Sequence, residues 1–150
     1  MSFLAKPAGT RRVVIDQITP SIDGGRHPFK RVVGDWVAFA AHAFADSHDL
    51  IQVELRIRKI NTESWQVFPM AARGNDEFEA TYRTESIGLF EHEIAGVVDH
   101  YGSWYEGFQK KHQEGGPLDL ECRIGAELLE QAAKRANKKH AAKLLEWAAQ

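Results

Sequence analysis

The hydrophobic pattern of this chain changes its period near residue 100, and that change limits what each half can fold into. Before this point apolar residues recur at every second position, as in β-strands with one buried face. Segment 51–58 is the clearest case, because its odd-numbered positions are apolar and its even-numbered positions are polar or charged. After residue 100 apolar residues recur three or four positions apart, which is typical of amphipathic helices. We therefore predict a mainly β fold followed by a C-terminal α-helical segment.

Further segments show the same alternation, with turns of Gly, Asn, Asp and Ser between them. These predicted strands are 12–18, 36–45, 65–70, 78–83 and 89–98. Segment 36–45 is almost wholly apolar, so we expect a central strand covered on both faces. Short strands at this spacing are typical of a two-sheet, immunoglobulin-like antiparallel β-sandwich. A lone cysteine excludes an internal disulfide, so Trp36 and Trp65 are the candidates for its core.

The C-terminal third predicts three helices. Segment 101–113 is the first, and the glycines and proline at 115–117 end it. Apolar stripes then predict helices at 124–136 and 137–149, with Asn137 as the N-cap of the last. We expect two domains, a β-sandwich over 1–100 and the start of a helical insert over 101–150.

Composition and charge exclude several classes of protein. The chain has 150 residues and a net charge of −2, which argues against a nucleic-acid binder. Its apolar runs are too short for a membrane span, and its first residues lack the pattern of a signal peptide. The single cysteine, Cys122, fits a reducing compartment, so we expect a cytoplasmic protein.

The spacing of reactive residues predicts neither a catalytic residue nor a bound metal or cofactor. The seven histidines form no metal-ligand motif, and no Gly-x-Ser-x-Gly elbow is present. In the pairs His48–Asp49 and Asp99–His100 adjacent side chains diverge, which is unsuitable for acid–base work. Glu91 and Glu93 share one strand face and could suggest a pair of glycosidase carboxylates. A catalytic pair is supported only by the fact that alternate strand residues share a face. We therefore interpret Glu91 and Glu93 as part of a solvated face.

Two groups of residues are candidates for ligand binding. Tyr101 and Trp104 belong to an aromatic cluster with Tyr105 and Phe108 that Lys110 and Lys111 follow, and flat rings with nearby donors suit a sugar. The alternative is that these rings anchor the helix to the sandwich or to a partner subunit. The second group lies beside a two-glycine turn, where three cations could bind an anion. Its members are Arg26, Lys30 and Arg31.

Several motifs resemble one known family. They are residues 23–34 (DGGRHPFKRVVG), 45–49 (ADSHD), 74–76 (GND) and 98–100 (VDH), together with Trp104. This set resembles the N-terminal region of the bacterial maltosyltransferases related to the α-amylases, which use maltose 1-phosphate to extend α-1,4-glucan. Ser47 stands where we expect glycine before the His-Asp pair.

The resemblance implies a non-catalytic support or dimerisation domain of such an enzyme. In that family the chemistry belongs to a later (β/α) barrel, and no barrel motif is present in this sequence. The partners implied are the rest of the parent enzyme, a second copy of the chain and an α-glucan, and the process is glycogen-like polymer synthesis. Because the family completes its sandwich beyond the helical insert, we expect an open sheet edge beside 89–98 and self-association. The alternatives are a free-standing α-glucan-binding module and a regulatory sandwich unrelated to glucans.

Overall fold

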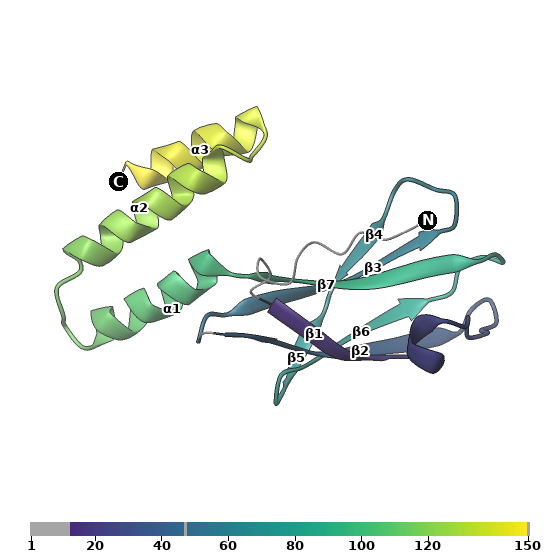
Figure 1. Ribbon diagram of the computed structural model, residues 1–150. Coiled ribbons are helices and arrows are strands. Elements are labelled where there is room, and N and C mark those ends of the chain that lie inside the picture. Colours follow the sequence, from purple (N-terminus) through teal and green to yellow (C-terminus); the bar gives the residue numbers. More distant parts are fainter. Residues whose placement is uncertain (1–12, 47, 150) are drawn as a thin grey trace. The chain divides into compact units, whose positions relative to one another are not determined.

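The computed structural model describes residues 13–46 and 48–149 and divides into two compact units. The first unit extends to Val98 and contains strands, and the second begins at Asp99 and contains helices (Figure 1). The protein is therefore mainly β with a C-terminal helical segment, and the predicted fold class is confirmed.

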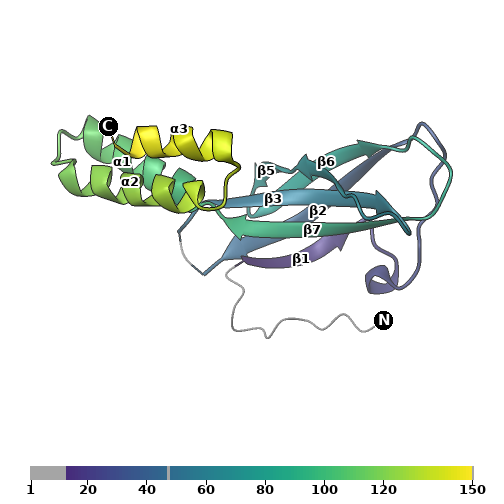
Figure 2. The same cartoon turned by 90° about the horizontal axis from the view of Figure 1, so that it is seen from above.

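The first unit is a two-layer antiparallel sandwich (Figure 2). One sheet has the order β1-β2-β6-β5 and the other β4-β3-β7, as in immunoglobulin-like domains. A short 3₁₀ turn, Asp23–Gly25, lies between the first two strands. The strands are β1 (Val13–Thr19), β2 (Trp36–Ala45), β3 (Ile51–Lys59), β4 (Gln66–Pro69), β5 (Ala71–Gly74), β6 (Glu77–Arg83) and β7 (Phe90–Val98).

The core lies between the sheets and uses alternate residues of β2, β3 and β6. On β3 the side chains of Leu55 and Ile57 are 0% and 3% exposed, which confirms the faces predicted from the alternation at 51–58. Phe78 and Tyr82 on β6 are also buried, as their spacing predicts. Phe90 and Ile94 of β7 pack against this core while remaining partly exposed.

The prediction that 36–45 is covered on both faces is wrong. Burial alternates along β2: Val37 and Phe39 point inward, whereas Trp36 is 69% exposed and Phe44 is 44% exposed. Trp36 is therefore not a core residue. The apolar residues on its outer face hid the alternation, because hydrophobic side chains also occupy much of a protein's surface.

The strand face that β4 turns to the core is also not the one predicted. A core position for Trp65 implies that Val67, two residues later, faces inward as well. Val67 is opposite Arg56 in the register and is 50% exposed, whereas Phe68 and Met70 face the core. Trp65 is partly buried, but its ring lies beneath the guanidinium of Arg58, 4.2 Å from the centroid, and not in the core. The four-residue strand β5 then pairs with β6 in the other sheet, where we predicted only a turn.

The second unit contains three helices, as predicted. They are α1 (His100–Gln113), α2 (Asp119–Ala133) and α3 (Lys138–Ala148). Helix α2 begins five residues before its predicted start at 124 and ends three residues before its predicted end at 136. The Asp99 carboxylate accepts a hydrogen bond of 2.8 Å from the Gly102 amide, which caps α1. Asn137 caps α3 as predicted, because its side-chain oxygen accepts from the His140 amide at 3.0 Å.

Strand β7 forms an edge of its sheet. It pairs with β3 from Ile51↔Val98 to Lys59↔Phe90, and no other described strand pairs with it. The open edge expected beside 89–98 is therefore present in the part of the chain that the structure describes. β7 has nine residues, whereas the edge strands β4 and β5 have four each.

Candidate functional site

The aromatic cluster on α1 is continuous. The ring centroids of Tyr101 and Trp104 lie 5.3 Å apart, and the Trp104 ring lies 6.2 Å from Tyr105 and 5.5 Å from Phe108. Residues three and four positions apart share a helix face, so this spacing brings the rings together on α1. The cluster is the strongest candidate site of the second unit.

Trp104 anchors α1 to α2. Its indole N–H donates a hydrogen bond of 2.8 Å to the main-chain oxygen of Glu121. Its six-membered ring lies where a side chain at Gly125 would stand, so only glycine fits there without a shift of the ring. The Lys111 ammonium supports the same contact by pairing with the Glu121 carboxylate, a residue only 8% exposed. Trp104 and Lys111 therefore have partners within the second unit.

Tyr101 and Tyr105 form the accessible part of the cluster. Their rings are 47% and 45% exposed and nearly parallel, with 5° between the planes and 6.3 Å between the centroids. Lys110 is exposed and forms an ion pair of 3.1 Å with Glu106 one turn earlier. Of the four predicted sugar-binding residues, Tyr101 is thus half-exposed, Lys110 is at the surface, and Trp104 and Lys111 contact α2. Tyr105 was not among them, although its i,i+4 spacing from Tyr101 signals the pair.

The cations predicted to bind an anion lie on the β1–β2 connection. Arg26 pairs with Asp23 at 3.5 Å. The Arg31 guanidinium lies 4.9 Å from the centre of the Phe29 ring and donates to the main-chain oxygen of Lys30. The contacts given for these residues do not join the three cations at one point, and the anion site stays a prediction.

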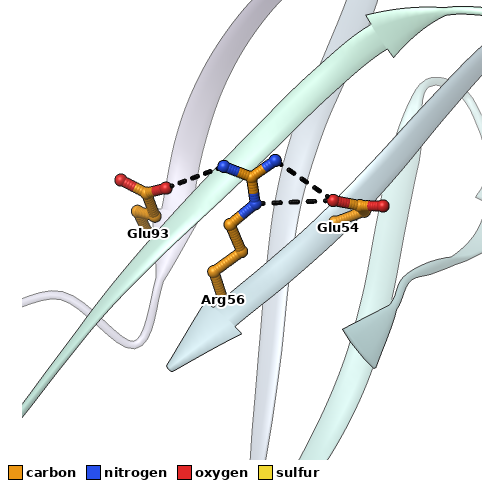
Figure 3. Close-up of polar contacts among 3 residues, drawn as sticks. All are labelled: Glu54, Arg56 and Glu93. Carbon is orange, nitrogen blue, oxygen red and sulfur yellow. Dashed lines mark hydrogen bonds and ion pairs between the residues drawn. The ribbon is translucent and has the colours of Figure 1, made fainter. Parts of the chain in front are cut away.

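Glu91 and Glu93 belong to a charged network on the outer face of the β3–β7 sheet. Arg56 bridges Glu54 and Glu93, with N–O distances of 3.2 Å to each (Figure 3). Arg58 pairs with Glu91 in the same way. Arginine partners hold these carboxylates in ion pairs on the sheet surface, which suits a surface ladder better than acid–base chemistry. These contacts agree with a solvated face.

His92 lies on the inward face of β7. Its ring centroid is 4.9 Å from that of Phe39 and 6.0 Å from that of Phe29. Burial beside these rings lowers the pKa of His92 from its usual 6.5, because the charged form loses its hydration. In the described residues no group of three His, Cys, Asp or Glu side chains is arranged to hold a metal ion.

Two of the sequence motifs meet at one end of the sandwich. A groove there joins the loop after β2 with the β5–β6 turn. Its polar lining includes Asp49, Asn75, Asp76 and Glu77, and its apolar lining includes Phe44 and Leu50. Asn75 and Asp76 adopt φ values of +51° and +61°, a conformation that Asn and Asp tolerate in tight turns. The topology explains this convergence, which the sequence alone does not predict.

A second groove lies between α2 and α3. Its lining is mostly apolar, and the Lys143 ammonium lies 4.9 Å from the centre of the Trp147 ring. The residues that line it are Ala132, Arg135, Ala136, His140, Lys143, Leu144 and Trp147. None of the helices described has the length and apolar character that crossing a bilayer requires.

The fold and these surfaces define an immunoglobulin-like sandwich domain with a helical extension. The family model for "alpha-1,4-glucan:maltose-1-phosphate maltosyltransferase, domain N/S" matches residues 11–150. The chain therefore belongs to this family and corresponds to that domain.

Relatives with this enzyme name support the assignment. The Chlorobaculum tepidum protein is 42% identical over 136 residues, which cover 91% of this chain and 20% of the relative. The Methylacidiphilum infernorum protein is 38% identical over 81% of this chain and 18% of its own length. The Salinibacter ruber protein is 33% identical over 87% of this chain and 20% of its own length. The chain thus spans about a fifth of the length of these relatives.

Proposed function

We propose that this chain is the non-catalytic N-terminal support and dimerisation segment of a maltosyltransferase. The parent enzyme transfers maltosyl units from maltose 1-phosphate to α-1,4-glucan, as the names of the relatives state for those proteins. In this proposal the parent is a cytoplasmic homodimer that works in glycogen-like polymer synthesis. The reacting groups lie in the remaining four-fifths of the enzyme.

The open edge of β7 is the observation that carries this proposal. Its inward residues His92 and Ile94 stay partly exposed, whereas Leu55 and Ile57 on the neighbouring strand are buried. An unpaired strand of nine residues offers a row of peptide groups to another strand. We therefore assign this edge to a strand from elsewhere in the parent enzyme.

The α2–α3 groove supports the dimerisation part. Trp147 lines this groove and is 49% exposed on the short helix α3. Ala132, Ala136 and Leu144 add to the apolar lining. Exposed apolar side chains that lie together in one patch mark interaction surfaces. A second copy of the chain is the occupant that we propose for this groove.

The support role can be tested by complementation. The Chlorobaculum tepidum enzyme, without the segment that aligns with this chain, is expressed alone and together with it. Phosphate release from maltose 1-phosphate with a malto-oligosaccharide acceptor is then measured. We expect activity only when both parts are present, and no turnover from this chain alone. Turnover by the isolated chain that is lost on mutating one of its own residues would overturn the proposal.

Sedimentation equilibrium at micromolar concentration tests the dimer. We expect a species of at least twice 16.9 kDa. Trp147→Glu places a charge in the α2–α3 groove and should produce monomers. Ile87→Glu is the matched control, because Ile87 is 86% exposed on the β6–β7 connection. If the unsubstituted 150-residue chain is a monomer, the dimerisation role is contradicted, while the complementation test is unaffected.

A further inference from the structure

We propose that Tyr101 and Tyr105 form a surface platform for an α-1,4-glucan chain. This binding site lies on α1 and goes beyond the support role, because it gives the domain a ligand of its own. It also differs from the four sugar-binding residues predicted within the aromatic cluster and after it, which included Trp104 and left out Tyr105.

The first step is that the aromatic rings of α1 differ in what they contact. Trp104 is held by Glu121 and Gly125 of α2, so its ring cannot serve an external ligand without breaking that contact. Tyr101 and Tyr105 are also aromatic, yet almost half of each side chain is accessible. Anchoring α1 to α2 therefore does not account for the tyrosine pair.

The geometry of the pair is the second step. The two ring planes are within 5° of parallel and their centroids lie 6.3 Å apart, so the two rings follow each other along the helix in one orientation. Phe108 and His112 continue the same helix face, and their rings are also nearly parallel, at 11°. The strip from residue 101 to residue 112 is roughly 16 Å long at the helical rise per residue. An elongated strip of exposed and partly exposed aromatic rings matches a chain of sugar rings.

The chemistry of the strip is the third step. An aromatic face is apolar and carries a negative π-surface, which attracts the C–H groups on the apolar face of a glucose ring. The tyrosine hydroxyls, the exposed Gln109 and the Glu106–Lys110 ion pair offer hydrogen bonds to sugar hydroxyls nearby. Charged residues are depleted at the core of a protein–protein interface, so this mixed surrounding favours a sugar over a protein partner.

The family decides which sugar the strip would meet. The relatives are named as enzymes that act on α-1,4-glucan, a polymer with many equivalent rings. A platform outside the reaction centre would hold such a polymer near the enzyme and raise its local concentration. We therefore commit to α-1,4-linked glucan as the occupant.

Affinity gel electrophoresis tests the platform on the intact 150-residue chain. We expect soluble amylose in the gel to retard the protein and dextran, an α-1,6-linked glucan, to leave it unaffected. The double variant Tyr101→Ala, Tyr105→Ala should weaken amylose binding by roughly tenfold or more. Tyr105→Phe keeps the ring and should bind within about threefold of the parent chain. Trp36→Ala removes an exposed aromatic ring from β2 of the first unit, outside both α1 and the α2–α3 groove, and should bind as the unsubstituted chain does.

Several outcomes would overturn the proposal. They are an unsubstituted chain that amylose does not retard, a double variant that binds as well as the unsubstituted chain, and a loss of binding that Trp36→Ala shares. A double variant that changes the oligomeric state without any glucan binding by the parent would instead assign the strip to a protein interface. If the double variant does not fold, the aromatic NMR signals of Tyr101 and Tyr105 in the parent must shift on adding maltoheptaose. Unchanged signals would also overturn it.

This test is independent of the support role. Complementation depends on the remainder of the enzyme, and dimerisation was assigned to α3, whereas glucan binding by α1 is measured on the isolated chain. If one proposal fails, the other can therefore still be tested.

Discussion

The indole N–H of Trp104 donates to the main-chain oxygen of Glu121, so an aromatic residue of α1 is fixed to the first turn of α2. The bond joins residues 17 positions apart and lies beside Gly125, whose missing side chain leaves room for the indole. Because the same ring meets both a hydrogen-bond acceptor and a close backbone, the contact fixes both the distance and the rotation of α1 relative to α2. Any side chain at Gly125 should disturb it.

Gly125→Ala is therefore expected to destabilise the helical unit. The added methyl group would overlap the Trp104 ring, and overpacking of this kind costs about 1–3 kcal/mol. The higher helix propensity of alanine offsets up to about 1 kcal/mol of this loss. Thermal unfolding followed by helical circular dichroism should show a lower midpoint.

Gly107→Ala is the matched control for that substitution. Gly107 also lies inside a helix, but a side chain there meets nothing within 4 Å. The same change should raise stability by about 0.5–1 kcal/mol through helix propensity alone. If both variants shift in the same direction, the close contact at Gly125 does not govern stability.

Leu55→Ala is expected to destabilise the sandwich. Leu55 is 0% exposed between the two sheets, and removing such a side chain leaves a cavity that costs about 2–5 kcal/mol. Denaturant unfolding measures the loss. Val67→Ala, on the half-exposed outer face of β4, is the control and should change stability by about 0.5 kcal/mol or less. Equal losses for the two variants would mean that the strand faces are assigned wrongly.

The sequence predicted an element well where polar residues mark one of its faces. The charged neighbours of Leu55 identify the buried side of β3, whereas Trp36 and Phe44 make the exposed side of β2 look like core. The short strand β5 escaped prediction because four residues carry too little periodicity, and its pairing with β6 depends on the tertiary fold.

The site shows the same limit at the level of side chains. The sequence located the aromatic cluster, because four aromatic residues between 101 and 108 are visible without a structure. It could not show that the adjacent residues Lys110 and Lys111 have different roles. Lys110 pairs with Glu106 of the same helix, whereas Lys111 points toward α2 and pairs with Glu121. Adjacent helix positions point about 100° apart, and only the packing of α2 decides which of them turns inward.

Arg56→Gln should weaken the sandwich slightly and in a salt-dependent way. The substitution removes the cation between Glu54 and Glu93, while all three side chains keep more than a third of their surface accessible. Exposed ion pairs of this kind are worth about 0.2–1 kcal/mol, and we expect a loss in that range. The loss should shrink in 1 M salt, where the screening length falls to about 3 Å. A loss that persists at high salt would point to packing of the Arg56 stem.

The last prediction concerns pH and rests on His92. Its pKa in the folded chain is below 6.5, whereas in the unfolded chain it returns to about that value. The unfolded chain therefore takes up the proton first as the pH falls. The stability linked to neutral His92 is complete above about pH 6.5 and declines as the pH drops through the window down to the folded pKa.

His92→Leu should reduce this pH dependence, because a neutral apolar side chain can occupy the space beside Phe29 and Phe39 without titrating. The measurement is the free energy of unfolding at about pH 7.5 and about pH 5.5 for both chains. We expect the parent to lose more stability than the variant between these two values. An NMR titration of the His92 ring gives an independent check, since its midpoint should lie below 6.5. An equal loss in both chains, or a midpoint above 6.5, would show that burial beside the two rings does not disfavour the charged imidazole.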